Sequence, residues 1–285
     1  MTNPEWRPLR GVDQRGLHEA RLQAHYSAQW LARIARGYVV PQPDDGHTSL
    51  RWVDALDGFI THPLKNGTRV SLQIATLTLA LHDGDESSRA QSIALNGRSD
   101  AQIRQWLGGQ LAARGLDPTA LDAPSPYEMP VHAIARGANY DAAGSADSLA
   151  ELVAWFANAN VLIGLVQQQM IGRKLAVSPV CCWPHHFDLA TLTTLTKRDA
   201  DAHGYLGVGL SPGDKYYDEP YFYVSAYPTP DPAVLPPLPA IGHWHTDEFV
   251  AAVLPAHKIL AAKNQQAETG EFLQRAATLA LEILS

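Results

Sequence analysis

The stretch that organises this sequence is Cys181–Ala190, which reads Cys-Cys-Trp-Pro-His-His-Phe-Asp-Leu-Ala. It contains both cysteines of the chain, two adjacent histidines, an aspartate and two aromatic residues. A second polar segment, Gly242–Glu248, has His-Trp-His-Thr-Asp at its centre. Between them lies Gly213–Tyr227, which is rich in tyrosine and acidic residues. Side chains that bind ligands or transfer protons are therefore concentrated in the C-terminal half, where we expect a functional site.

The first stretch predicts a face for each of its polar residues. If residues 183–190 form a strand, successive side chains point to opposite faces. His185 then shares the packed face with Trp183, whereas His186 and Asp188 share the other face. An imidazole and a carboxylate on one face are suited to ligand binding or proton transfer.

The second segment predicts a partner for this pair. If it is extended, its two histidines share a face and Trp244 lies behind them. Two such strands side by side would bring together a set of metal-ligating side chains: His186, Asp188, His243 and His245. Two or three histidines with a carboxylate bind zinc, iron or manganese, so a divalent metal is one expectation. Two interpretations without a metal remain open. In the first, the histidines are structural and form hydrogen bonds with Asp188 and Asp247. In the second, His186 and Asp188 form a general-base pair in which Asp188 fixes the tautomer of His186.

The segment between them predicts an amphipathic strand. Alternation places Tyr221, Tyr223 and Tyr227 on one face, and Phe222 and Val224 on the face expected to join the core. A tyrosine face suits a pocket wall or an interface. The alternative is cross-strand packing on an exposed sheet.

Composition limits the class of protein. The chain has 285 residues, a formal net charge of −7 and a pI near 5.9, and such an acidic surface repels nucleic acids and anionic membranes. Its most apolar window, Trp155–Val166, is too short to cross a bilayer, and no apolar leader is visible. The adjacent cysteines are poorly placed for a disulfide. We therefore expect a soluble cytoplasmic protein.

Periodicity predicts an α+β protein. Helices are expected over residues 16–36, 99–115, 148–171 and 269–284, with His18 and His25 on a solvated stripe of the first. Strands are expected in two groups: 49–53, 58–63, 69–75, 77–81, 92–95 and 131–135, then 175–182, 185–192, 205–210 and 221–227. Asn66-Gly67 favours a tight hairpin, and a phase shift near Ala75 indicates a bulge or break. The pattern predicts two similar helix–antiparallel sheet–helix modules, residues 1–140 and 141–285, which either share one sheet or form separate sheets.

The second half also resembles a known family. Ser178-Pro179-Val180, six residues, and then Phe187-Asp188-Leu189-Ala190 is similar to the pattern of an uncharacterised bacterial family, a domain of unknown function. Further matches include His203, Ala226-Tyr227-Pro228 and Trp244-His245. The family pattern has Gly-Ser in place of His185-His186, which implies that a metal site using His186 is a subgroup feature. The resemblance implies an architecture and no reaction.

Two functions follow as expectations. The first is an enzyme or binding protein for a small molecule, with catalytic residues Asp188, His203 and His245 and ligand-binding residues Tyr221, Tyr223 and Trp244. The second is a non-catalytic module, a possible homo-oligomer, in which the tyrosine strand is an interface.

Overall fold

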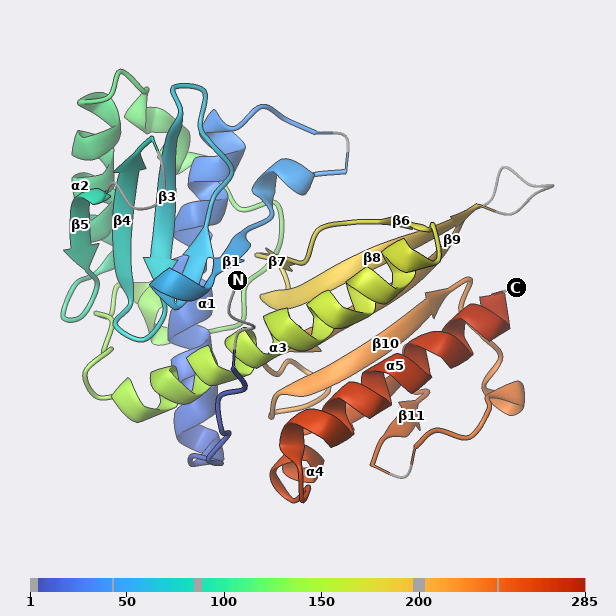
Figure 1. Cartoon of the computed structure of the whole chain (residues 1–285). Coiled ribbons are helices and arrows are strands. Elements are labelled where there is room, and N and C mark those ends of the chain that lie inside the picture. The colour runs from blue at the N-terminus through green and yellow to red at the C-terminus, as the bar shows by residue number, and fades with distance from the viewer. Residues whose placement is uncertain (1–4, 43, 85–88, 197–202, 240, 285) are drawn as a thin grey trace. The chain divides into compact units, whose positions relative to one another are not determined.

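The fold is mixed α+β, as predicted. The computed structural model describes residues 5–42, 44–84, 89–196, 203–239 and 241–284, without the side chains of residues 89, 90, 196 and 203 (Figure 1). These ranges contain two antiparallel sheets and five α-helices: α1 (Gln14–Tyr38), α2 (Asp100–Ala112), α3 (Ala146–Gly172), α4 (Ala256–Leu260) and α5 (Gln265–Leu284).

The chain divides into two compact units. The N-terminal unit consists of residues 12–153 and 182–187. The C-terminal unit consists of residues 1–11, 154–181 and 188–285. The boundary therefore falls inside α3, and each unit contains one of the two sheets.

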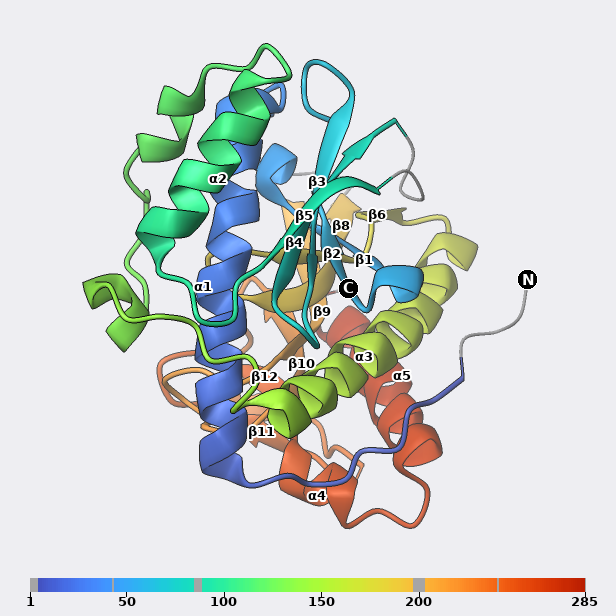
Figure 2. The same ribbon diagram turned by 90° about the vertical axis from the view of Figure 1, so that its left-hand side faces the viewer.

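The sheet of the N-terminal unit is a five-stranded meander. Its strands follow in chain order: β1 (Arg51–Val53), β2 (Gly58–Ile60), β3 (Thr68–Gln73), β4 (Thr78–Asp83) and β5 (Arg89–Ala94). The hairpin predicted at Asn66-Gly67 joins β2 to β3, with Gly67 at a φ of +84°. The predicted break near Ala75 is a tight turn between β3 and β4. Helices α1 and α2 lie on the same side of this sheet (Figure 2), over its buried side chains Phe59, Leu72 and Leu79.

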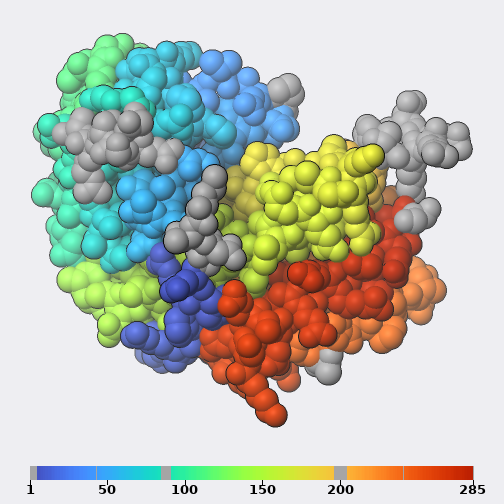
Figure 3. All heavy atoms as spheres, viewed as in Figure 1, coloured from blue at the N-terminus to red at the C-terminus, as the bar shows by residue number. Residues whose placement is uncertain are grey.

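The sheet of the C-terminal unit has seven strands. They are β6 (Ala176–Val177), β7 (Cys181–Trp183), β8 (Asp188–Thr196), β9 (His203–Ser211), β10 (Tyr221–Tyr227), β11 (His243–His245) and β12 (Ala251–Pro255). The order is β11-β12-β10-β9-β8-β6, with β7 also paired to β8. Helix α5 and residues 154–172 of α3 cover one face and lie side by side (Figures 1 and 3). Phe222 and Val224 are buried, as predicted.

Helix α3 is longer than its most apolar window suggested. Its 27 residues make it the one helix in the described ranges that is long and apolar enough to cross a membrane. However, 72% of that apolar window is buried, as in the core helix of a soluble protein. Leu149, Phe156 and Met170 lie on the buried side of α3.

The strand predicted over residues 183–190 is wrong. β7 ends at Trp183, residues 184–187 form a turn in which Phe187 has a φ of +59°, and β8 begins at Asp188. Because the turn interrupts the alternation, His186 and Asp188 do not share a strand face, and His185 is exposed rather than packed.

The same turn explains a second correction. The carbonyl oxygen of Pro184 accepts hydrogen bonds from Nε2 of His25 and Nε2 of Gln29, each at 2.8 Å, and the His25 ring stacks on Phe187. His25, predicted on a solvated stripe, is therefore buried. The strand predicted at residues 131–135 is also wrong, since a short 3-10 helix occupies Ala133–Arg136.

Candidate functional site

Strand register gathers most of the predicted site residues on one face of the seven-stranded sheet. Tyr223 is paired with Val253, and Val253 with His243, so these three side chains point to the same side. The face opposite Phe222 and Val224 carries a group that we call the tyrosine–histidine face: Asp188, Tyr217, Tyr221, Tyr223, His243 and His245. All six belong to the C-terminal unit.

The buried part of this face is a carboxylate–phenol pair. Tyr223 Oη donates to Asp188 Oδ2 at 2.5 Å, and Asp188 is buried. The Tyr223 ring reaches Asp188 by lying across Gly209, where an added Cβ would be 2.5 Å from the ring. Burial and the Asp188 charge raise the pKa of Tyr223 well above its ordinary value, so this phenol stays a proton donor.

A second carboxylate fixes the loop beside the sheet. Asp214 Oδ1 accepts from the backbone N–H groups of Tyr216 and Tyr217, and Asp214 Oδ2 accepts from Tyr221 Oη at 2.5 Å. These bonds hold the chain after Pro212-Gly213 in one conformation. Tyr217 is thereby placed against Tyr221, with ring centroids 4.7 Å apart.

Tyr217 bridges the two histidines of β11. Its Oη lies 3.0 Å from Nε2 of His243 and 3.0 Å from Nδ1 of His245. His245 Nε2 lies 2.6 Å from the carbonyl oxygen of Asp247. Tyr217 and His245 are partly exposed and His243 is exposed, so solvent reaches this part of the face.

The hydrogen-bond partners determine the direction of this chain. A carbonyl only accepts, so Nε2 of His245 carries a proton and, in neutral His245, Nδ1 accepts from Tyr217. A phenol has one proton, so its oxygen must accept the second bond from Nε2 of His243. The chain therefore runs from His243 through Tyr217 to His245, and the neutral His243 keeps its lone pair on Nδ1.

Electrostatics keep His243 and Tyr217 in the protonation states that proton transfer requires. Partial burial, together with His245 and other nearby cations, lowers the pKa of His243, so its imidazole is neutral at pH 7. Partial burial and the charges of Asp214 and Glu219 raise the pKa of Tyr217, so its phenol remains protonated.

Aromatic rings and charged residues surround His245. Phe249 stacks on the imidazole with centroids 4.1 Å apart, and Tyr216 contacts both rings. Glu248 accepts hydrogen bonds from Lys215 Nζ at 2.7 Å and Tyr216 Oη at 2.8 Å. This frame limits the rotation of the His245 ring.

One predicted residue of this sheet, Trp244, does not join the face. Trp244 points to the opposite face, and its Nε1 donates to the carbonyl oxygen of Pro236 at 2.7 Å. His203 begins β9, but its side chain is outside the described part of the structure. His186 belongs to the N-terminal unit, whereas the other three predicted metal ligands belong to the C-terminal unit.

Metal binding stays a prediction. No group of three or more His, Cys, Asp or Glu side chains arranged to hold a metal occurs among the described residues. The tyrosine–histidine face brings His243 and His245 together through a phenol, an arrangement suited to proton transfer.

The sequence interpretation missed Tyr217 and Asp214. The available signal was local: an aspartate directly after Pro212-Gly213 often accepts from backbone N–H groups two and three residues on. The position of Tyr217 beside His243 and His245 depends, in addition, on the pairing of both β10 and β11 with β12.

Comparison with known proteins identifies the family but gives it no activity. No curated protein and no solved structure matches the chain. One family model, described as "Family of unknown function (DUF5996)", matches residues 18–283, which include both units. The matched range covers nearly the whole sequence, and the predicted resemblance to an uncharacterised family is confirmed. The chain therefore belongs to the family of unknown function DUF5996.

Proposed function

We propose that the protein is an acid–base enzyme for a small polar molecule, which binds on the tyrosine–histidine face. The observation that supports this most is the bridge of Tyr217 between His243 and His245, at 3.0 Å to each ring. Two imidazoles joined by one phenol can exchange a proton without a change in the positions of the heavy atoms.

The proton would follow the directed hydrogen-bond chain. His243 Nδ1 accepts a proton from the substrate, and His243 Nε2 passes its own proton to Tyr217 Oη. Tyr217 in turn passes its proton to His245 Nδ1, so that the positive charge rests on His245 beside the Asp247 carbonyl oxygen. His243 is returned to a neutral state, and the reverse sequence delivers a proton.

The surrounding charges indicate the substrate class. Four acidic residues lie on or beside the face: Asp214, Glu219, Asp247 and Glu248. Lys215 pairs with Glu248 and His257 pairs with Glu219, so two of the four acidic residues have basic partners. The other two, together with the phenol and phenyl rings, favour a neutral or cationic molecule, such as an alcohol or amine, over an anion. The protein would act in the cytoplasm, in line with the burial of its two cysteines.

The test is ligand binding and proton coupling in Tyr217→Phe. This variant keeps the ring but removes Tyr217 Oη, the atom that contacts both imidazoles. We expect imidazole NMR titrations of His243 and His245 to be coupled in the wild type and independent in the variant. A thermal-shift screen of small alcohols and amines should find ligands that stabilise the wild type and bind the variant at least tenfold more weakly.

Tyr227→Phe is the matched control. Tyr227 lies on β10, on the face that carries Tyr221 and Tyr223, is 59% exposed and contacts Tyr205. Tyr227→Phe should leave both the histidine titrations and the ligand affinity as they are in the wild type. Independent titration of the two histidines in the wild type, or equal ligand binding by both variants, would contradict the proposal.

A further inference from the structure

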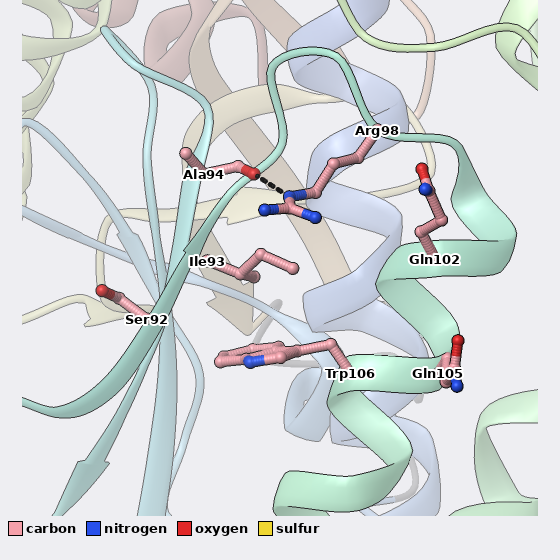
Figure 4. Close-up of a pocket in the computed structure, with 7 residues that line it drawn as sticks. All are labelled: Ser92, Ile93, Ala94, Arg98, Gln102, Gln105 and Trp106. Atoms are coloured by element: carbon pink, nitrogen blue, oxygen red, sulfur yellow. Dashed lines mark hydrogen bonds between the residues drawn. The ribbon is translucent and has the colours of Figure 1, made fainter.

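A groove separate from the tyrosine–histidine face lies between strand β5 and helix α2 in the N-terminal unit (Figure 4). Its volume is about 540 Å³. The strand side consists of Ser92, Ile93 and Ala94. The helix side consists of Arg98, Gln102, Gln105 and Trp106.

The strand side is the edge of a sheet. β5 is the last strand in the order β1-β2-β3-β4-β5, and its described pairing is with β4. In an antiparallel ladder, the backbone groups of alternate residues point toward the partner strand and away from it. The N–H of Leu95 bonds to the carbonyl oxygen of Leu77 just before β4, so the odd-numbered residues of β5 face β4.

The backbone groups of Ser92 and Ala94 therefore point outward. One bond confirms the direction, because the carbonyl oxygen of Ala94 accepts from Arg98 Nε at 3.0 Å rather than from β4. Ser92, Ile93 and Ala94 include no Pro and no charged residue, which are the residues that commonly protect an edge from strand addition.

The side chains of the groove add selectivity to this edge. The Trp106 indole extends toward β5 beside Ile93, and the Arg98 guanidinium lies over the opposite end of Ile93 (Figure 4). Because the Nε of Arg98 is bonded to Ala94, the terminal nitrogens of the guanidinium are the ones shown facing the groove. Among the described residues that line the groove, Arg98 is the one that carries a charge, and this charge is positive.

We propose that this groove binds an extended acidic peptide, which adds to β5 as a sixth strand. The peptide backbone would pair with the N–H and C=O groups of Ser92 and the N–H of Ala94. Alternate apolar side chains would pack on Ile93 and Trp106, and a carboxylate would bind Arg98. A second copy of this chain pairing edge to edge is disfavoured, because β5 carries no acidic residue to meet Arg98.

The experiment is a selection of random twelve-residue peptides displayed on phage, followed by affinity measurement with one synthetic enriched peptide. Enriched sequences should alternate apolar residues and include Asp or Glu. Ser92→Pro removes the outward N–H without disturbing the ladder to β4 and should weaken binding of the synthetic peptide at least tenfold. Ser92→Ala keeps the N–H and is the matched control, with affinity within about twofold of the wild type.

Arg98→Gln tests whether the positive charge of Arg98 binds a carboxylate of the peptide. The acidic peptide should bind this variant at least tenfold more weakly, and a repeated selection on it should no longer enrich Asp or Glu. The proposal is overturned if Ser92→Pro and Ser92→Ala bind equally, or if no peptide is enriched on folded protein. It is also overturned if light scattering finds a wild-type dimer that Ser92→Pro converts to a monomer, because a second copy then occupies the edge.

Discussion

Because Gly209 has no side chain, it leaves the space in which the Tyr223 ring of the tyrosine–histidine face lies. The Tyr223 ring occupies the space where a Cβ would stand, at 2.5 Å, and from there its hydroxyl reaches Asp188. Any other residue at this position would push the ring away. The hydrogen bond to a buried carboxylate therefore depends on a glycine in the middle of β9.

Gly209→Ala should destabilise the protein by about 1–3 kcal/mol, because overpacking displaces Tyr223 and leaves the Asp188 carboxylate with a poorer donor. Urea unfolding of Gly209→Ala, Tyr223→Phe and the double variant tests this account. The two losses should be strongly non-additive, since both remove the same hydrogen bond. Additive losses would mean that Gly209 acts on something other than Tyr223.

At the scale of elements, the turn at residues 184–187 is held on α1 by one carbonyl oxygen. Pro184 accepts from His25 and Gln29, and Tyr127 Oη in turn donates to Gln29 Oε1 at 2.8 Å. Burial lowers the pKa of His25 to about 4, whereas an exposed histidine has a pKa of 6.5. The attachment of the turn to α1 therefore involves a neutral imidazole that donates through Nε2.

This attachment predicts a dependence of stability on pH. The folded pKa lies below the unfolded one, so the unfolded chain binds the proton first, and stability falls as the pH drops from 6.5 toward 4. At pH 5 the contribution of His25 is a loss of about 2 kcal/mol relative to pH 7. In His25→Gln the amide can still donate to Pro184, and urea unfolding at the two pH values should show a difference smaller by that amount. An unchanged difference would contradict the buried neutral state.

The elements themselves were predictable wherever local chemistry is decisive. Asn66-Gly67 specified its hairpin and the apolar periodicity specified α1 and α3. In the structure, Ser99 and Gln102 begin α2 with a capping box, which is also a local feature. Alternation assigned Tyr221 and Tyr223 to one face and Phe222 to the other. These features depend on neighbours within a few residues.

The rest depends on contacts that no local pattern contains. The strand predicted over residues 183–190 is wrong because Pro184 begins a turn. The carbonyl oxygen of Pro184 accepts hydrogen bonds from side chains of α1, which is far away in the sequence. The meeting of Tyr217 with His243 and His245 depends on the strand order β11-β12-β10, which periodicity does not specify. The sequence predicted Asp188 and His245 as site residues, but it did not assign them their hydrogen-bond partners, Tyr223 and Tyr217.

At the scale of the whole molecule, charge is the property that sequence determines most directly. The formal net charge of −7 repels polyanions over the range of the Debye length. We expect no retention on immobilised heparin and no shift of duplex DNA at about 50 mM salt, a low ionic strength at which phosphate contacts are strongest. Salt-sensitive retention would mean that a local basic patch overrides the overall charge.

The short excursion of residues 182–187 into the N-terminal unit limits how the gene can be divided. In this excursion the backbone of Cys182 exchanges two hydrogen bonds with Leu50, at 2.7 and 2.9 Å. A gene fragment that stops at residue 153 encodes Leu50 without this partner, and a fragment that begins at residue 154 encodes Cys182 without Leu50. A split of the gene at any single codon between these residues would place the pair on two chains, and its two hydrogen bonds would then have to form between separate molecules.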